Sequence, residues 1–202
     1  MKHLKVTLEF LELILGSSPA DSDIYRTYIG SKAPDAKTIE DEVQDLGVEE
    51  VADSKMTIFQ KKDGKPILRA YQIRGFFKGT CGFLRKIKTE ECAKESAKIS
   101  AYKKLIDGCI FVEPSVIPIE MHSGNLGICS RPLRASTPQG ERVALASSEE
   151  APVGSTITFV VICPDQYEAA VREWLDYGLY SGMGQWRNSG KGRFEVRSIE
   201  AI

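Results

Sequence analysis

The stretch at residues 178–194, GLYSGMGQWRNSGKGRF, constrains this chain most, because five of its residues are glycine. Glycine lets a backbone turn sharply and lets another backbone approach closely. Between the glycines lie an aromatic residue, Trp186, and the cations Arg187, Lys191 and Arg193. Cations and exposed amides favour a phosphate chain, and an indole offers a face on which bases stack. The alternative is a long turn between a helix and a strand whose charges are merely solvated.

Length and composition limit the classes of protein to which this chain can belong. The 202 residues suffice for one well-cored domain with an insertion, or for two small ones. No apolar run approaches the ~20 residues of a membrane helix, so we expect a cytoplasmic chain without a membrane partner. The five cysteines form no CxxC pair, which predicts neither a disulfide framework nor a zinc site. We expect no metal and no cofactor.

Charge is unevenly distributed along a chain whose net charge is −1. Residues 61–104 carry 13 cations and 4 anions, and residues 185–202 carry 4 and 2. The two remaining segments, 1–60 and 105–184, are acidic, each with a net charge of −6. If the fold brings the two basic segments together, they form a basic face on a neutral protein. The alternative is that lysine-rich helix surfaces serve only solubility.

Hydrophobic periodicity predicts the elements. Alternating apolar residues predict a strand over 3–11, and the spacing of Ile24, Tyr25, Tyr28 and Ile29 predicts helix in an acidic insertion at 17–55. The other expected strands and the long hairpin lie at 56–60, 67–71, 109–121, 124–148, 156–163 and 193–199. The other expected helices lie at 72–88, 90–106 and 166–177.

The order of these elements is βαββαβ with additions. It predicts an α+β protein of the ferredoxin-like or RRM-like class, with a helical insertion after the first strand and a long β-hairpin. We expect residues 1–202 to form a single domain.

Three stretches in this order resemble motifs of one family. The sequence Ile73-Arg74-Gly75-Phe76-Phe77-Lys78-Gly79, followed by Leu84-Arg85, resembles the helix-opening "I-P-G-S-S-L-K-G…L-R" motif of the RAMP (repeat-associated mysterious protein) superfamily, although it lacks the proline and both serines. The segment 137–158 is similar to the hairpin and "E-x-V-P-x-G-T" strand entry of those proteins. Residues 182–193 resemble their closing loop, "G-x-G…R-x-x-G-x-G-R". The resemblance covers most of the chain.

The resemblance implies a non-enzymatic, CRISPR backbone-like protein that binds single-stranded nucleic acid, with RNA favoured over DNA. It implies a homo-oligomer that assembles head to tail along a strand, or a subunit of a larger ribonucleoprotein. It also implies that the protein is part of an antiviral defence system or is encoded by a phage or prophage. We expect nucleic acid to contact the cations, the tryptophan and the closing glycines, which are Lys78, Arg85, Arg131, Arg134, Gly182, Gly184, Trp186, Arg187, Gly190, Lys191, Gly192 and Arg193.

Catalytic chemistry has little support in the sequence. A lone histidine in an expected loop, His122, is more often solvated than catalytic, and we assign no catalytic residue. RAMP backbones that cut use an aspartate between the first strand and the first helix, where this chain has Asp21, Asp23, Asp35 and Asp53 among many acidic residues. Two alternatives stay open: a phage-type structural protein that self-assembles or blocks a host complex, and a RAMP-type endoribonuclease.

Overall fold

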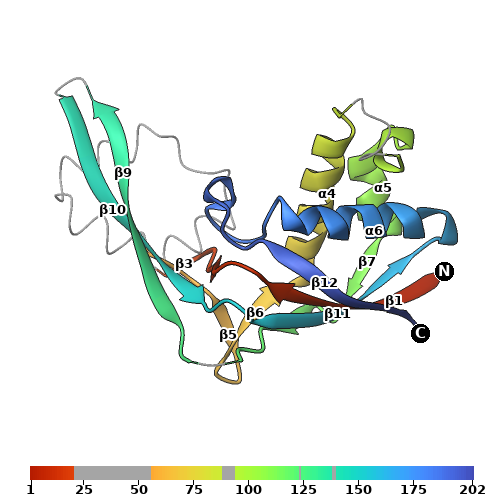
Figure 1. The fold of residues 1–202 in the computed structure, drawn as a ribbon, viewed down its shortest axis with the longest axis horizontal. Helices are drawn as coiled ribbons and strands as arrows, with labels where there is room; N and C mark the ends of the chain where they lie inside the picture. Colours follow the sequence, from red (N-terminus) through yellow and green to blue (C-terminus); the bar gives the residue numbers. More distant parts are fainter. Residues whose placement is uncertain (21–55, 88–93, 123, 138–139) are drawn as a thin grey trace. The chain divides into compact units, whose positions relative to one another are not determined.

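The computed structural model describes residues 1–20, 56–87, 94–122, 124–137 and 140–202, and only the backbone within 133–145 (Figure 1). Contacts divide the chain into two compact units. The first comprises Met1–Ile14, Lys61–Asn125 and Ala151–Ile202, and the second comprises Leu15–Gln60 and Leu126–Glu150. The expected helices of the insertion fall at 21–55, outside the described residues. The assignment of residues 1–202 to a single domain stays a prediction.

A four-stranded sheet forms the centre of the first unit. Its strands lie in the order β12 (Phe194–Ala201), β1 (Lys2–Phe10), β11 (Thr156–Cys163) and β7 (Phe111–Glu113), and every neighbouring pair is antiparallel. The register of β1 against β11 runs from Lys2 opposite Cys163 to Glu9 opposite Thr156. The sheet therefore joins the first strand of the chain to the last.

The first strand forms as its alternation predicts. One face of β1 carries only apolar side chains, and none of them is exposed: Leu4, Val6, Leu8 and Phe10. Because side chains in a strand alternate between faces, this period of two places all four against the core.

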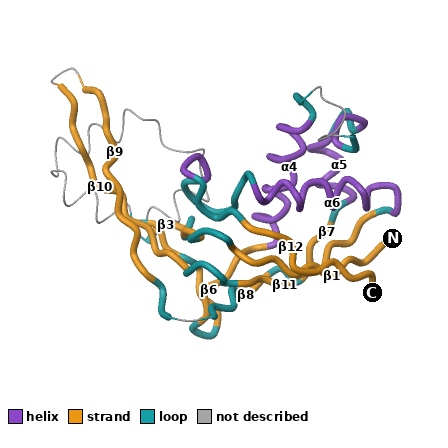
Figure 2. The backbone as a smooth tube through the Cα atoms, viewed as in Figure 1, coloured by secondary structure: helices purple, strands orange, loops and turns teal. Residues whose placement is uncertain are grey.

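Three helices lie on one face of this sheet (Figures 1 and 2). They are α4 (Ala70–Leu84), α5 (Tyr102–Cys109) and α6 (Glu168–Asp176). Aromatic contacts hold them: the rings of Phe77 and Trp174 lie 5.5 Å apart, and α4 reaches β12 through Phe76 and Phe194 at 5.1 Å. Short 3-10 turns accompany the helices in the described part of the chain, at Ser96–Lys98, Asp165–Tyr167, Tyr177–Leu179 and Arg187–Ser189.

The helix predicted at 90–106 is wrong in its extent. Residues 88–93 lie outside the description, but Ser96–Lys98 is a 3-10 turn and the α-helix begins only at Tyr102. Ile99 has φ −94° and ψ 109°, which is extended backbone, so a helix cannot continue through it. The expected terminator, Asp107-Gly108, lies inside α5.

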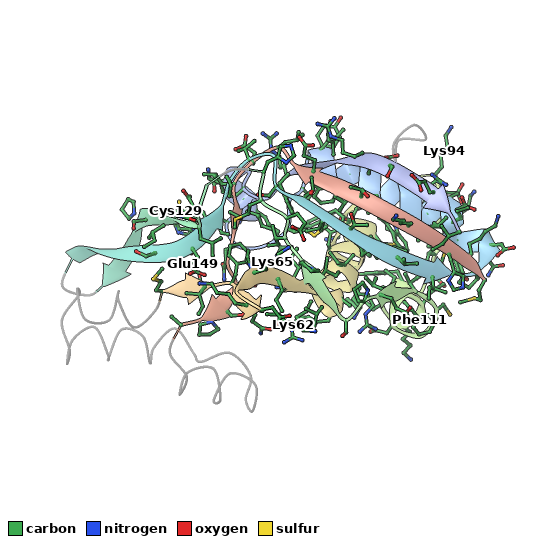
Figure 3. All side chains as sticks on the ribbon, turned by 90° about the horizontal axis from the view of Figure 1, so that it is seen from below. Lys62, Lys65, Lys94, Phe111, Cys129 and Glu149 are labelled. Atoms are coloured by element: carbon green, nitrogen blue, oxygen red, sulfur yellow. The ribbon has the colours of Figure 1, made fainter. Side chains whose placement is uncertain are left out.

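A small three-stranded sheet has the order β5 (Gln60–Lys62), β6 (Lys65–Arg69) and β8 (Val116–Pro118), and β6 leads directly into α4. The turn between β5 and β6 has positive φ at Asp63 and Gly64, as the predicted hairpin requires. The ammonium of Lys65, which Figure 3 labels, lies 3.1 Å from the carboxylate of Glu120.

A long hairpin dominates the second unit. Strands β9 (Gly127–Thr137) and β10 (Gly140–Ala151) pair antiparallel from Gly140 opposite Thr137 to Glu150 opposite Gly127, which confirms the predicted hairpin. Three two-residue strands extend this sheet, at Ile14–Leu15 (β2), Ser18–Pro19 (β3) and Thr57–Ile58 (β4). The carboxylate of Glu149 (Figure 3) accepts a hydrogen bond from the backbone N–H of Phe59 at 2.9 Å.

The α+β class is confirmed. Within the described ranges, no helix is both long and apolar enough to cross a membrane. Cys81 and Cys163 are buried free thiols, and burial raises the pKa of each. They pack as small hydrophobic residues, as expected.

Candidate nucleic-acid interface

Backbone hydrogen bonds hold the glycine-rich loop between α6 and β12 in place. Met183 N–H donates to the carbonyl of Gly192 at 3.0 Å, and Gly192 N–H donates to the carbonyl of Leu13 at 2.9 Å. At the end of the loop, Leu11 N–H donates to the carbonyl of Arg193 at 2.8 Å. The loop is therefore a defined substructure attached to the segment after β1.

Two of the glycines are required by close approach within the loop. A Cβ at Gly182 would lie 2.1 Å from the carbonyl oxygen of Lys191, and one at Gly192 would lie 1.9 Å from that of Met183. Gly192 also has φ +70°, in the left-handed region. Both glycines are buried. Their evident role is to let the two arms of the loop meet.

The two other predicted loop glycines, Gly184 and Gly190, turn the chain with φ near +80°. Trp186 also adopts positive φ, at 59°. Such a conformation is an outlier for a bulky side chain and carries strain. The Trp186 carbonyl accepts hydrogen bonds from the N–H and the hydroxyl of Ser189, both at 2.9 Å, which hold the turn. The backbone that carries the half-buried Trp186 indole is therefore held in one conformation at the centre of the loop.

The three loop cations divide into two kinds. Arg187 is exposed and Lys191 is half-buried, and neither makes an ion pair with any residue in the described part of the chain. Arg193 instead turns inward, because its guanidinium lies 3.0 Å from a carboxylate oxygen of Glu12 and donates to the carbonyl of Gly190 at 3.3 Å. Arg187 and Lys191 are available to a phosphate, whereas Arg193 braces the loop.

The predicted cations of α4 point to a neighbouring helix. Lys78 lies 2.5 Å from the carboxylate of Asp107, and the Arg85 guanidinium lies 5.3 Å from the centre of the Tyr102 ring. Both partners are on α5 rather than in the glycine-rich loop. These two residues therefore join α4 to α5, and Arg85 remains exposed.

The glycines of α4 are not explained by packing against the sheet. A Cβ at Gly75 or Gly79 would meet no atom within 4 Å. Only Gly82 lies against a neighbour, with the Tyr102 hydroxyl 2.8 Å from its Cβ position. Close packing against the sheet therefore does not require these glycines, since the Cβ positions of Gly75 and Gly79 are in open space and that of Gly82 faces Tyr102 of α5.

The hairpin arginines belong to the second unit. Arg131 is half-buried on β9, and burial lowers its pKa below the ordinary value. Its backbone pairs with Ala146, and that of Arg134 pairs with Val143. The side chain of Arg134 lies outside the described part of the structure.

Sequence reasoning missed a second aromatic residue beside the loop. Tyr180 is 74% exposed, and its ring lies 5.8 Å from that of Tyr177. An exposed aromatic ring beside a cationic loop offers a face on which a base can stack. Its signal in the sequence was a tyrosine between Gly178 and Gly182, in a segment too short to bury it.

The described residues contain no group of three or more His, Cys, Asp or Glu side chains that could hold a metal ion. His122 is exposed and forms no part of such a group.

Comparison with known proteins gives a structural relative. No family model matches the chain, and no curated protein matches it in sequence. The fold is similar to that of a chain in the cryo-EM structure of the Type III-B Cmr-beta bound to cognate target RNA, with a TM-score of 0.55 and 13% identity. The likeness is one of fold. It covers 100% of this chain and 60% of that chain, so this protein spans about three fifths of its relative's length.

Proposed function

We propose that this chain is a non-enzymatic, RAMP-like protein that binds single-stranded nucleic acid, RNA rather than DNA. The observation that carries the proposal is the fold similarity to a chain from an RNA-bound Type III-B Cmr complex. The motif resemblances at residues 73–85, 137–158 and 182–193 are independent of the fold and point to the same kind of protein. On this proposal, residues 1–202 form one RAMP-like domain that includes the insertion at 17–55.

The strand order supports a ferredoxin-like topology for this domain. α4 lies in sequence between β1 and β7, and β11 lies between those two strands in the sheet, antiparallel to both. This is the split β-α-β arrangement of that fold. β12 then completes the sheet beside β1.

The loop supplies the contacts that we assign. Arg187 and Lys191 bind phosphates, while Trp186 and the exposed Tyr180 offer aromatic faces to bases. Base–aromatic stacking contributes about 1–3 kcal/mol per base and tolerates any sequence. The glycines shape the loop.

The remaining predicted contacts are proposed as a second set. Arg193, Lys78 and Arg85 already have partners within the fold, so phosphate contact by them requires exchange of those partners. Arg131 and Arg134 lie on the hairpin of the second unit, and we propose them as separate phosphate contacts of that unit.

The test is binding of a labelled single-stranded RNA, followed by fluorescence anisotropy at several salt concentrations. We expect Arg187→Ala with Lys191→Ala to weaken binding about tenfold or more, and to reduce the salt slope by about 0.7 for each lost phosphate contact. The matched control is Lys94→Ala with Lys103→Ala, which removes the same charge from exposed residues outside the loop. Equal affinity in the loop variant, or equal losses in both variants, contradicts the assignment.

The same RNA tests the non-enzymatic part of the proposal. Incubation of the wild-type protein with end-labelled RNA, with and without EDTA, should leave the RNA intact. Specific cleavage that disappears in the His122→Ala variant would replace this part of the proposal with an endoribonuclease.

A further inference from the structure

A cleft of about 430 Å³ opens in the first unit, on the helical side of the sheet. It lies between the segment that precedes α5, α5 itself and the start of α6, and its lining includes Glu95, Lys98, Ile99, Lys104, Gln166 and Tyr167. The volume falls within the range of about 300–1,000 Å³ that is typical of small-molecule sites. None of the residues of the glycine-rich loop lines it.

A partly buried hydrogen-bond network holds the backbone at Glu95, which lines the cleft. The Glu173 carboxylate, on α6, accepts from the backbone N–H groups of Glu95 at 3.0 Å and Ser96 at 2.8 Å, and from the Ser96 hydroxyl. The Trp174 indole N–H donates to that hydroxyl at 2.9 Å. Ser96 and Trp174 are both fully buried. The cleft wall is therefore preformed, which reduces the ordering cost of binding.

The lining of the cleft includes two cations, Lys98 and Lys104. Lys98 already lies 2.7 Å from the carboxylate of Glu95. Lys104 is exposed and has no ion pair with any residue in the described ranges. The first turn of α5, which carries Lys104, has no acidic residue, so the field of the helix adds to that of the lysine. This side of the cleft favours an anion.

The rest of the lining includes apolar and aromatic side chains. Ile99 and Ala170 are 6% and 2% exposed, and Leu105 and the half-buried Tyr167 also line the cleft. The Gln166 amide can both donate and accept hydrogen bonds. An inorganic anion would use only the lysine, and a purely apolar ligand would bury it unpaired.

We propose that this cleft binds a nucleoside phosphate. The phosphate pairs with Lys104, the base packs against Tyr167 and Ile99, and Gln166 hydrogen-bonds to the polar edge of the base. A free nucleotide and the 5′-phosphorylated end of an RNA strand share this chemistry. The site is separate from the glycine-rich loop and does not depend on the function proposed for it.

The first experiment is titration of the full chain with AMP by isothermal calorimetry. We expect saturable binding that Lys104→Ala weakens about tenfold, the loss expected for one charge-assisted hydrogen bond. Tyr167→Ala should also weaken binding, whereas Tyr167→Phe, which keeps the ring, should retain it. The matched control is Lys103→Ala, because Lys103 is an exposed cation of the same helix that does not line the cleft. Adenosine and inorganic phosphate should each bind more weakly than AMP.

The second experiment distinguishes the two sources of the nucleotide. The Arg187→Ala/Lys191→Ala variant should bind AMP as the wild type does, since these residues lie outside the cleft. In this background, a preference for 5′-phosphorylated over 5′-hydroxyl RNA that Lys104→Ala removes identifies the strand end as the ligand. AMP binding without that preference identifies a free nucleotide.

Two results would overturn the proposal: no saturable AMP binding by the folded wild type, or equal weakening by Lys103→Ala and Lys104→Ala. Failure of RNA to bind the wild type would overturn the proposed function alone, because the AMP titration is independent of it.

Discussion

At the scale of single residues, glycine serves two opposite purposes in this chain. Gly192 has positive φ, and any Cβ there would overlap the Met183 carbonyl. Gly75 is exposed within α4, where a Cβ would meet nothing. In the sequence, both residues are glycines near cations. Only their surroundings in the structure show that glycine is required at position 192 and merely tolerated at position 75.

This contrast predicts opposite effects of one substitution. Gly192→Ala should lower the free energy of unfolding by at least about 1–3 kcal/mol, since an L-residue is strained at positive φ and must also displace the Met183 carbonyl. Gly75→Ala should raise it by about 0.5–1 kcal/mol, because alanine favours a helix interior more than glycine does. Urea unfolding followed by circular dichroism measures both. Equal effects at the two sites would contradict the assigned roles.

Site residues could be predicted from the sequence where their role depends on nearby residues, but not where it depends on a contact that is distant in the sequence. Trp186, Arg187 and Lys191 could be selected from the loop sequence, because aromatic and cationic residues among glycines suffice to suggest an anion site. The inward turn of Arg193 could not, because its partner Glu12 is 181 residues away.

At the scale of elements, local pattern determined most of the outcome. β1 and β11 were predicted nearly to the residue, because apolar and polar side chains alternate along β1 and β11 is a short run rich in Thr, Val and Ile. The helix expected at 90–106 had a regular alanine spacing, yet Glu173 holds Ser96 in a 3-10 turn and Ile99 is extended. The residue pattern within 90–106 carries no information about the Glu173 carboxylate, because that residue belongs to α6. The sequence of this segment therefore could not predict the break in the helix.

The pairing of β1 with β12 gives a pH-dependent prediction. The guanidinium of Arg197 on β12 donates to the Glu9 carboxylate on β1 at 2.7 Å, and this hydrogen bond lowers the pKa of Glu9 below its ordinary value of 4.5. A carboxylate with a lowered pKa in the folded state stabilises that state above its ordinary pKa, and the contribution is lost as pH falls through the folded-state pKa. We expect the coupling between these two side chains to exist at neutral pH and to vanish in acid.

A double-mutant cycle of Glu9→Gln and Arg197→Gln, measured by urea unfolding at neutral and acidic pH, determines that coupling. Both side chains are solvent-accessible, so the coupling should be small and should weaken with salt. Arg197 also lies 3.0 Å from Glu195, and the cycle removes this second contact from the comparison. A coupling that is independent of pH would show that the carboxylate charge is not its source.

At the scale of the whole molecule, ion pairs within the protein determine which positive charges remain available to a ligand. Segment 61–104 is strongly basic, yet Lys65, Lys78 and Lys98 each have an acidic partner. In the last basic segment, Arg193 and Arg197 are paired as well. The count of charges therefore overstated the basic face, whereas the loop cations Arg187 and Lys191 have no acidic partner among the described residues to compete with a ligand.

The arrangement of chains on RNA is the last prediction. If the protein assembles head to tail along a strand, the mass of the complex, measured by light scattering, should rise with RNA length in steps of one chain, because each added length of strand offers one further site. The protein without RNA should show no such growth, and the Arg187→Ala/Lys191→Ala variant should lose it, whereas the Lys94→Ala/Lys103→Ala control should keep it. Growth without RNA, or unchanged growth in the loop variant, would favour self-assembly through protein contacts alone. A constant mass at every RNA length would leave one chain per strand, which is the behaviour of a single subunit within a larger ribonucleoprotein.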